Sequence, residues 1–156
     1  MLAKVHSFIL VGIDPLACEV EVDVSLHGLA KTTVVGLAQA AVKESIERVK
    51  RAVINSGYPF PRHALLVNLA PADVKKEATA LDLPMAVGVL RGTNFIQNDR
   101  HKDYLIAGEL ALDGRVRKLE DICTPVMQCN VCKGCTVIPV DDWNEFPTAP
   151  GGVCPG

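Results

Sequence analysis

The chain has 156 residues, of which 49% are hydrophobic but only 4% are aromatic. This length corresponds to one ordinary domain with a sizeable core, and the low aromatic content means that Val, Leu, Ile and Ala must build that core. Sixteen basic and 18 acidic side chains give a net charge of −2, which argues against the chain alone as a strong nucleic-acid binder, because such domains usually carry a basic excess.

The first third of the sequence predicts three strands. Residues 17–26 alternate apolar and polar side chains, which is the pattern of a half-buried strand. Apolar runs at 5–11 and 32–35 predict a strand before and a strand after it, and Asp14 with Pro15 marks the turn between the first two. We therefore expect an antiparallel meander of three strands to open the domain.

Residues 37–56 change to a helical period. Five apolar residues fall on one helical stripe, namely Ala38, Val42, Ile46, Val49 and Val53. The opposite face is charged, with i,i+4 pairs Glu44–Arg48 and Glu47–Arg51 in the favoured order. Four basic residues, Lys43, Arg48, Lys50 and Arg51, could face a nucleic acid. The interleaved glutamates favour a solvated face instead.

The second half of the sequence predicts further helices and strands. Residues 64–70 are an apolar strand without alternation, as expected when both faces are covered. A helix over 81–91 follows a polar loop, with Asp82 as its N-cap and Pro84 in its first turn. Asp113-Gly114 predicts a hairpin between 104–110 and 111–117. The last predicted elements are a helix at 120–133 and a strand at 135–140.

The search for catalytic or nucleotide-binding motifs is mostly negative. No P-loop and no glycine-rich dinucleotide fingerprint occurs in the chain. Thr79 is the only hydroxyl in the polar entry to the helix at 81–91, a place where nucleophiles are often activated. His63 and His101 are distant in sequence, so we interpret Thr79 as a loop or cap residue.

Five of the six cysteines are concentrated near the C-terminus, at 123, 129, 132, 135 and 154. The spacing Cys129-x2-Cys132-x2-Cys135, with Cys154 as a fourth thiolate, resembles part of an iron–sulfur motif. A helix over 122–133 would instead place Cys129 and Cys132 on one face as small buried hydrophobes, and this second interpretation is preferred. No apolar run is long enough to span a membrane and no leader is recognisable, so we expect a reducing cytoplasm.

Several longer motifs occur in a characteristic order. They are VGL at 35–37, AVKES at 41–45, ERV at 47–49, NSG at 55–57, VNLAPAD at 67–73, KE at 76–77, DLP at 82–84 and GELALDG at 108–114. Together they resemble the N-terminal domain of the magnesium-chelatase-like AAA+ ATPases of the ComM (YifB) group. The resemblance spans roughly residues 3–122 and extends more loosely to about 145.

The resemblance implies a Lon-protease-like domain with the ribosomal protein S5 domain 2-like fold, which is an α+β fold with helices packed on a mixed sheet. Residues 1–145 would form this domain, and 146–156 a Pro- and Gly-rich tail or linker. Relatives of this kind continue into a AAA+ module, which carries the sites for ATP and Mg, and they assemble into hexameric rings. ComM is associated with branch migration of DNA during natural transformation.

The same resemblance bears on peptidase activity. Aligning the Lon motifs places Ala80 on the serine nucleophile and Cys123 on its lysine partner, so both members of the catalytic dyad are missing. We therefore predict no catalytic, cofactor-binding or metal-binding residues in this chain. Its expected role is that of a non-catalytic accessory domain for ring assembly or DNA engagement. The alternatives are a divergent Lon-like peptidase using Thr79 or Cys123, and a metal or redox module built on the cysteine cluster.

Overall fold

The computed structural model describes residues 1–11, 14–36, 40–72, 79–117 and 137–139. Two α-helices, two 3-10 turns (η1 and η2) and eight strands lie within these residues. In chain order they are β1 (Leu2–Val11), β2 (Asp14–Val24), β3 (Thr32–Val35), α1 (Ala40–Asn55), β4 (Leu65–Ala70), η1 (Thr79–Leu81), α2 (Asp82–Gly92), η2 (Arg100–Asp103), β5 (Tyr104–Ile106), β6 (Glu109–Leu110), β7 (Val116–Arg117) and β8 (Val137–Pro139).

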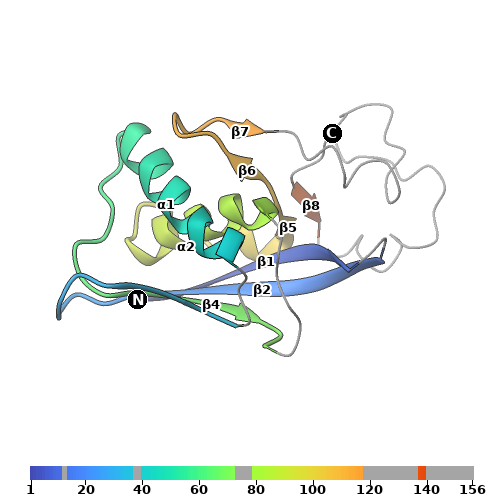
Figure 1. Cartoon of the computed structure of the whole chain (residues 1–156), viewed down its shortest axis with the longest axis horizontal. Helices are drawn as coiled ribbons and strands as arrows, with labels where there is room; N and C mark the ends of the chain where they lie inside the picture. Colours follow the sequence, from blue (N-terminus) through green and yellow to red (C-terminus); the bar gives the residue numbers. More distant parts are fainter. Residues whose placement is uncertain (12–13, 37–39, 73–78, 118–136, 140–156) are drawn as a thin grey trace.

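Six of the strands form one mixed sheet in the order β3-β4-β2-β1-β5-β8. The β3–β4 and β1–β5 pairs are parallel, and the remaining neighbours are antiparallel. Helices α1 and α2 lie over the same face of this sheet (Figure 1). Strands β6 and β7 make a separate hairpin beside the helices. The expected α+β fold with a mixed sheet is confirmed.

The expected opening meander is wrong in its third strand. Strands β1 and β2 do pair antiparallel, but β3 pairs parallel with β4, and β4 lies between β3 and β2. A parallel pair needs a crossover connection, and α1 supplies it between β3 and β4. Asp14 and Pro15 also do not form a turn, because they begin β2 opposite Val11 and Leu10.

The core lies between the helices and the sheet. The alternation in β2 is confirmed, since Cys18, Val20, Val22 and Val24 are all buried. The α1 stripe is confirmed too at Val42, Ile46, Val49 and Val53, while Ala38 lies outside the described residues. Gly88 allows α2 to approach the sheet closely, because a Cβ atom there would collide with the Val22 side chain.

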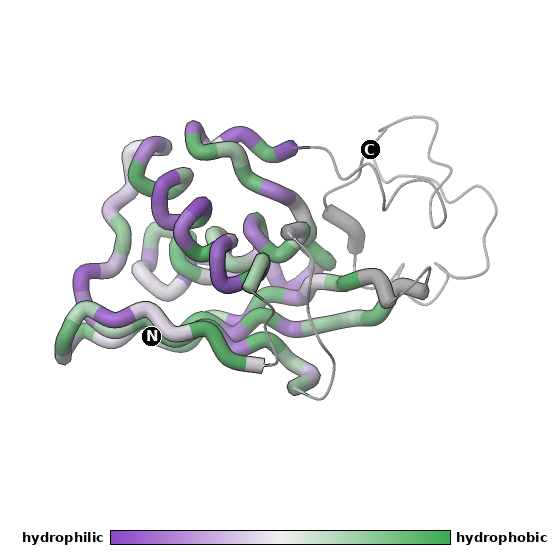
Figure 2. The backbone as a smooth tube through the Cα atoms, in the orientation of Figure 1, coloured by the Kyte–Doolittle hydropathy of each residue, from purple (hydrophilic) through white to green (hydrophobic). Residues whose placement is uncertain are grey.

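No helix within the described residues covers the other face of the sheet, and the expectation that both faces of β4 are buried is wrong. Leu66 on this strand is exposed and Asn68 is only half-buried. The Asn68 side-chain amide donates a hydrogen bond to Glu21 Oε1 at 2.8 Å. Lys4 Nζ lies 3.7 Å from Glu19 Oε1 and 3.5 Å from Glu21 Oε2. This face is therefore polar, as is common when one face of a sheet meets water; Figure 2 shows the mixed colouring of its strands.

The elements of the second half follow the prediction with two corrections. Helix α2 has the predicted extent, with Pro84 in its first turn, but Leu81 occupies the N-cap position and Asp82 is the first helical residue. Only β6 and β7 form the predicted hairpin, which turns at Gly114 with φ +91°, because β5 belongs to the large sheet. The predicted last strand is β8, antiparallel to β5. The predicted helix at 120–133 and the tail at 146–156 lie outside the described residues.

One histidine is buried in η2. His101 is 8% exposed, and neither of its ring nitrogens has a hydrogen-bond partner among the described residues. This burial lowers the pKa of His101, and Lys102 and Arg91 lower it further, while the Asp99 carboxylate and the nearby backbone of Lys4 act in the opposite direction. The folded state therefore favours the neutral imidazole.

This histidine predicts a loss of stability in mild acid. Because the folded-state pKa lies below the unfolded value, the unfolded chain binds the proton first as the pH falls below about 6.5. The free energy of unfolding should then decrease by at most about 1.4 kcal/mol per pH unit from this one proton. Urea denaturation at several pH values between about 7.5 and 5 gives the free energy of unfolding at each pH. This free energy should fall less steeply with decreasing pH in His101→Gln than in the wild type. The exposed His27→Gln is the control, and equal slopes in both variants would contradict the prediction.

Among the described residues, no helix combines the length and the apolar character needed to cross a membrane.

Candidate functional site

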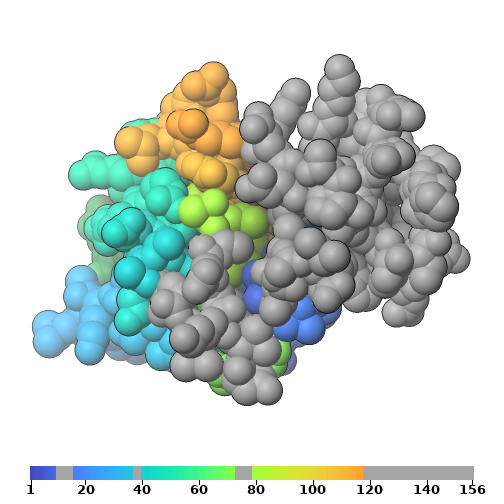
Figure 3. Space-filling model, turned by 45° about the vertical axis from the view of Figure 1, so that its right-hand side comes forward, coloured from blue at the N-terminus to red at the C-terminus, as the bar shows by residue number. Residues whose placement is uncertain are grey.

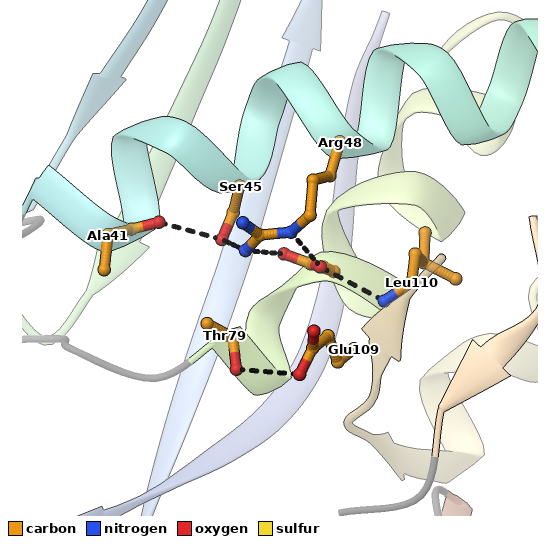
Figure 4. A network of polar contacts seen from close by, with 7 residues as sticks. Ala41, Ser45, Arg48, Thr79, Glu109 and Leu110 are labelled. Atoms are coloured by element: carbon orange, nitrogen blue, oxygen red, sulfur yellow. Dashed lines mark hydrogen bonds and ion pairs between the residues drawn. The ribbon is translucent and has the colours of Figure 1, made fainter. Parts of the chain in front are cut away.

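A buried carboxylate lies at the start of α2. Asp82 is fully buried, and its two oxygens accept three hydrogen bonds (Figure 4). Arg48 donates through Nε at 3.0 Å and through Nη2 at 3.3 Å, and the backbone N–H of Leu110 donates at 3.1 Å. A buried charge is tolerated only when it is paired and hydrogen-bonded in this way. The side chain thus joins α2 to both α1 and β6.

Arg48 reaches this carboxylate from the middle of α1. Its side chain is 28% exposed, and Nη2 also donates to Ser45 Oγ at 2.7 Å. The Ser45 hydroxyl donates in turn to the Ala41 carbonyl at 3.1 Å. The hydrogen bond that Arg48 donates to Asp82 raises the pKa of Arg48 above its ordinary value, while partial burial opposes this rise. The expectation that Arg48 belongs to a solvated basic face of α1 is therefore wrong, because the buried carboxylate draws it inward.

Ala80, which the resemblance aligns with the serine nucleophile of Lon proteases, lies next to this network. Ala80 is buried in η1, and its carbonyl accepts a hydrogen bond from the Gly108 N–H at 2.7 Å. The Leu83 N–H donates to the Gly108 carbonyl at 2.9 Å. These two bonds hold the entry of α2 against the segment that precedes β6, with a methyl group where a nucleophile would be needed.

Thr79 also has a structural partner. Its hydroxyl donates to Glu109 Oε2 at 3.4 Å, and the two side chains point toward each other in Figure 4. An activated threonine needs a general base in close hydrogen-bond contact, which can be a histidine, an amine or a carboxylate. The Glu109 contact is longer than the ~2.5–3.0 Å that is usual for an O–H···O hydrogen bond. His63 Nδ1 instead lies 3.2 Å from the Gly28 carbonyl, and His101 lies in η2. Within the part of the chain that the structure describes, no hydrogen bond links Thr79 to either histidine.

The network is therefore a charge-paired junction between α1, α2 and β6. Arg48 is the cation, Asp82 is the buried anion, and Glu109 adds a second negative charge close enough to favour the guanidinium. The three recorded hydrogen bonds to the Asp82 carboxylate all come from protein atoms, two from Arg48 and one from the Leu110 N–H. Its chemistry suits the fixing of helix positions better than the binding or activation of a substrate.

Five of the six cysteines lie outside the described residues. A metal or redox role for these five stays a prediction; they are Cys123, Cys129, Cys132, Cys135 and Cys154. Cys18 is buried in the core of β2. The described ranges contain no group of three or more His, Cys, Asp or Glu side chains that could hold a metal ion.

Sequence reasoning missed the central pair of the junction. Arg48 and Asp82 are 34 positions apart, and no local pattern links them. One signal was available in α1: Ser45 falls beside the apolar stripe and is fully buried. A buried serine within a helix needs polar partners, and one of these partners is Arg48.

Comparison with known proteins agrees with the motifs. Residues 20–141 match the family model described as subunit ChlI of Mg-chelatase. The protein YifB of Salmonella typhimurium is 42% identical over 116 residues, which are 74% of this chain and 23% of that protein. YifB of Escherichia coli is 40% identical over the same length and the same shares of both chains. The competence protein ComM of Haemophilus influenzae is 33% identical over 144 residues, or 92% of this chain and 28% of ComM.

The chain thus spans about a quarter of the length of these curated relatives. The match to the family model covers well over half of the chain, and it includes both helices and the junction between them. The ordered motifs, the mixed sheet and the sequence matches agree, and the chain belongs to the family of the ChlI subunit of Mg-chelatase, together with YifB and ComM.

Proposed function

We propose that this chain is a non-catalytic accessory domain of a ComM-type AAA+ ATPase, serving assembly of the ATPase ring or engagement of DNA. The observation that carries the proposal is the state of the Lon-like position. Ala80 places a buried methyl group there, and the nearby Arg48 and Asp82 side chains are paired with each other. Such a domain can position neighbours but has no nucleophile at that site.

The relatives support the wider setting of the proposal. The chain covers about a quarter of their length, and one of them is named as a competence protein. The remaining length in this proposal is a AAA+ module in the same polypeptide, which would hold ATP and Mg. A homo-hexameric ring acting in DNA branch migration would then present several copies of this domain to the same DNA.

The absence of catalysis by the domain is directly testable. We expect the purified chain to hydrolyse neither ATP nor casein, because it lacks a Walker motif and the dyad positions are Ala80 and Cys123. ATP hydrolysis by the chain alone would overturn the accessory role. Casein cleavage that is lost in Thr79→Ala or Cys123→Ala would favour a divergent peptidase instead.

The accessory role itself is tested in the full gene product. Removing residues 1–145 should leave ATP hydrolysis by the AAA+ module measurable but should reduce either ring assembly, seen by light scattering, or DNA-stimulated hydrolysis. A full product that assembles and responds to DNA normally without these residues would contradict the proposal.

A further inference from the structure

The near-neutral net charge conceals a strongly uneven distribution. The stretches 24–43 and 48–72 contain no aspartate and no glutamate. They carry six basic residues, namely Lys31, Lys43, Arg48, Lys50, Arg51 and Arg62. Arg48 is neutralised by Asp82, but the other five have exposed side chains. A local basic excess of this kind attracts polyanions even when the whole chain is slightly acidic.

Two loops within these stretches are held side by side at one end of the molecule. The Ser25 N–H donates to the Ala64 carbonyl at 2.9 Å, and the Leu65 N–H donates to the Lys31 carbonyl at 2.8 Å. His63 Nδ1 lies 3.2 Å from the carbonyl of Gly28. Loop 25–31 is thereby fastened to the loop that precedes β4, which also carries Arg62.

Helix α1 contributes a further positive charge to this end. Lys50 Nζ lies 5.9 Å from the ring centroid of Phe60, within the distance of a cation–π contact. Phe60 belongs to the same loop before β4 as Arg62 and His63. We name the surface formed by loop 25–31, residues 58–64 and Lys50 the basic tip.

Two leucines project from the basic tip. Leu26 is 74% exposed and Leu29 is 90% exposed. The loop that bears them has a defined shape, because Ser25 Oγ donates to the His27 carbonyl at 2.8 Å and Gly28 adopts φ +98°. Loop 25–31 forms the light-blue projection at the left of Figure 3. Two largely exposed leucines on an anchored, protruding loop indicate a contact surface rather than core packing.

We propose that the basic tip binds DNA, with Lys31, Lys50 and Arg62 against the phosphates and the two leucines against bases at an opened or unpaired step. This inference rests on the proposed function and adds the surface and the mode of contact. Apolar side chains that insert at base steps are a recurrent device of DNA-binding proteins, and basic groups beside them supply affinity. The basic side chains of the tip suit a phosphate backbone, and the exposed Asp23, which borders loop 25–31, is 3.9 Å from the N-terminal amine.

The charges of the tip are tested with the complete chain and fluorescently labelled DNA, either a forked substrate with unpaired arms or a fully paired duplex. The double variant Lys31→Glu, Arg62→Glu should weaken binding to both DNAs by about tenfold or more. It should also make the binding constant less dependent on salt concentration, as expected for the loss of about two phosphate contacts. The matched control is Lys102→Glu, Arg115→Glu, which alters charge equally at exposed residues outside the tip. Circular dichroism checks that all variants are folded.

The leucines are tested separately. Leu26→Ser, Leu29→Ser should leave duplex affinity nearly unchanged but weaken binding to the forked DNA by about fivefold or more, since the apolar contacts with unpaired bases are lost. Leu112→Ser, at an exposed leucine outside the tip, is the control and should bind both DNAs like the wild type.

Three outcomes would overturn the inference. The first is that the wild-type chain binds neither DNA at low salt. The second is that the tip and control charge variants weaken DNA binding equally. The third is that the leucine variants change self-association in gel filtration without changing DNA binding. The last outcome would identify the tip as an interface between copies of the chain. None of these would contradict the accessory role, which is judged by deletion of residues 1–145 from the full gene product.

Discussion

Arg48→Met is expected to lower the free energy of unfolding by about 3–5 kcal/mol, because it leaves the Asp82 carboxylate buried without its cation. Only the Leu110 N–H would remain as a recorded donor to that carboxylate. Chemical denaturation in urea, with the midpoint and slope compared to wild type, measures the change.

The matched control lies on the same helix. Arg51→Met removes an exposed guanidinium from α1 and should change stability by no more than about 0.5 kcal/mol. Asp82→Asn should be milder than Arg48→Met, with a loss of about 1–3 kcal/mol, because Arg48 is partly exposed and water can hydrate its charge. Equal effects of Arg48→Met and Arg51→Met would show that the junction contributes little to stability.

Gly36→Ala is expected to destabilise the chain by about 3 kcal/mol or more. Gly36 has φ +99°, a conformation that side chains rarely adopt, and a Cβ atom there would overlap the backbone of Leu69. Relief of that overlap requires the chain after β3 to move away from β4, which disturbs the edge of the sheet.

Gly28→Ala separates the cost of backbone strain from the cost of steric overlap. Gly28 has nearly the same φ, +98°, but a Cβ atom there would meet nothing within 4 Å. Its substitution should therefore cost only the backbone strain, about 1–2 kcal/mol. Thermal unfolding of both variants followed by circular dichroism makes the comparison. If the two alanine variants melted alike, close packing against Leu69 would have no part in the effect.

The predictions that came from local patterns were the most accurate. The period of two in β2 and the helical stripe of α1 each depend on residues within a few positions, and the burial of Val22 and Val49 confirms them. The turn at Gly114 was predicted for the same reason. Such patterns reflect one element meeting one apolar surface, whatever lies on the other side of that surface.

The errors concern relations between distant segments. The strands before α1 were expected to pair in chain order, but β4 arrives through the crossover helix and takes the place beside β2. Asp82 was expected to cap its own helix, yet its carboxylate is bound by Arg48 and the Leu110 N–H. In both cases the competing partner is far away in sequence, and local propensity contains no information about it.

The functional interpretation divides in the same way. The motifs at 35–37, 67–73 and 108–114 are sufficient in sequence alone to indicate the family, and the family model then matches residues 20–141. The overall charge of −2 suggested weak attraction to nucleic acids. The structure joins the loop that bears Lys31 to the loop that bears Arg62 by backbone hydrogen bonds, and it places Lys50 5.9 Å from Phe60 of the second loop.

By itself, the sequence determined the family, the α+β class and most of the element positions, because these depend on residue identity and short-range periodicity. Only the tertiary structure decided the strand order, the uncovered polar face of the sheet, the inward position of Arg48 and the exposure of Leu26 and Leu29. These features arise from hydrogen bonds and packing between segments that the chain brings together only when it folds.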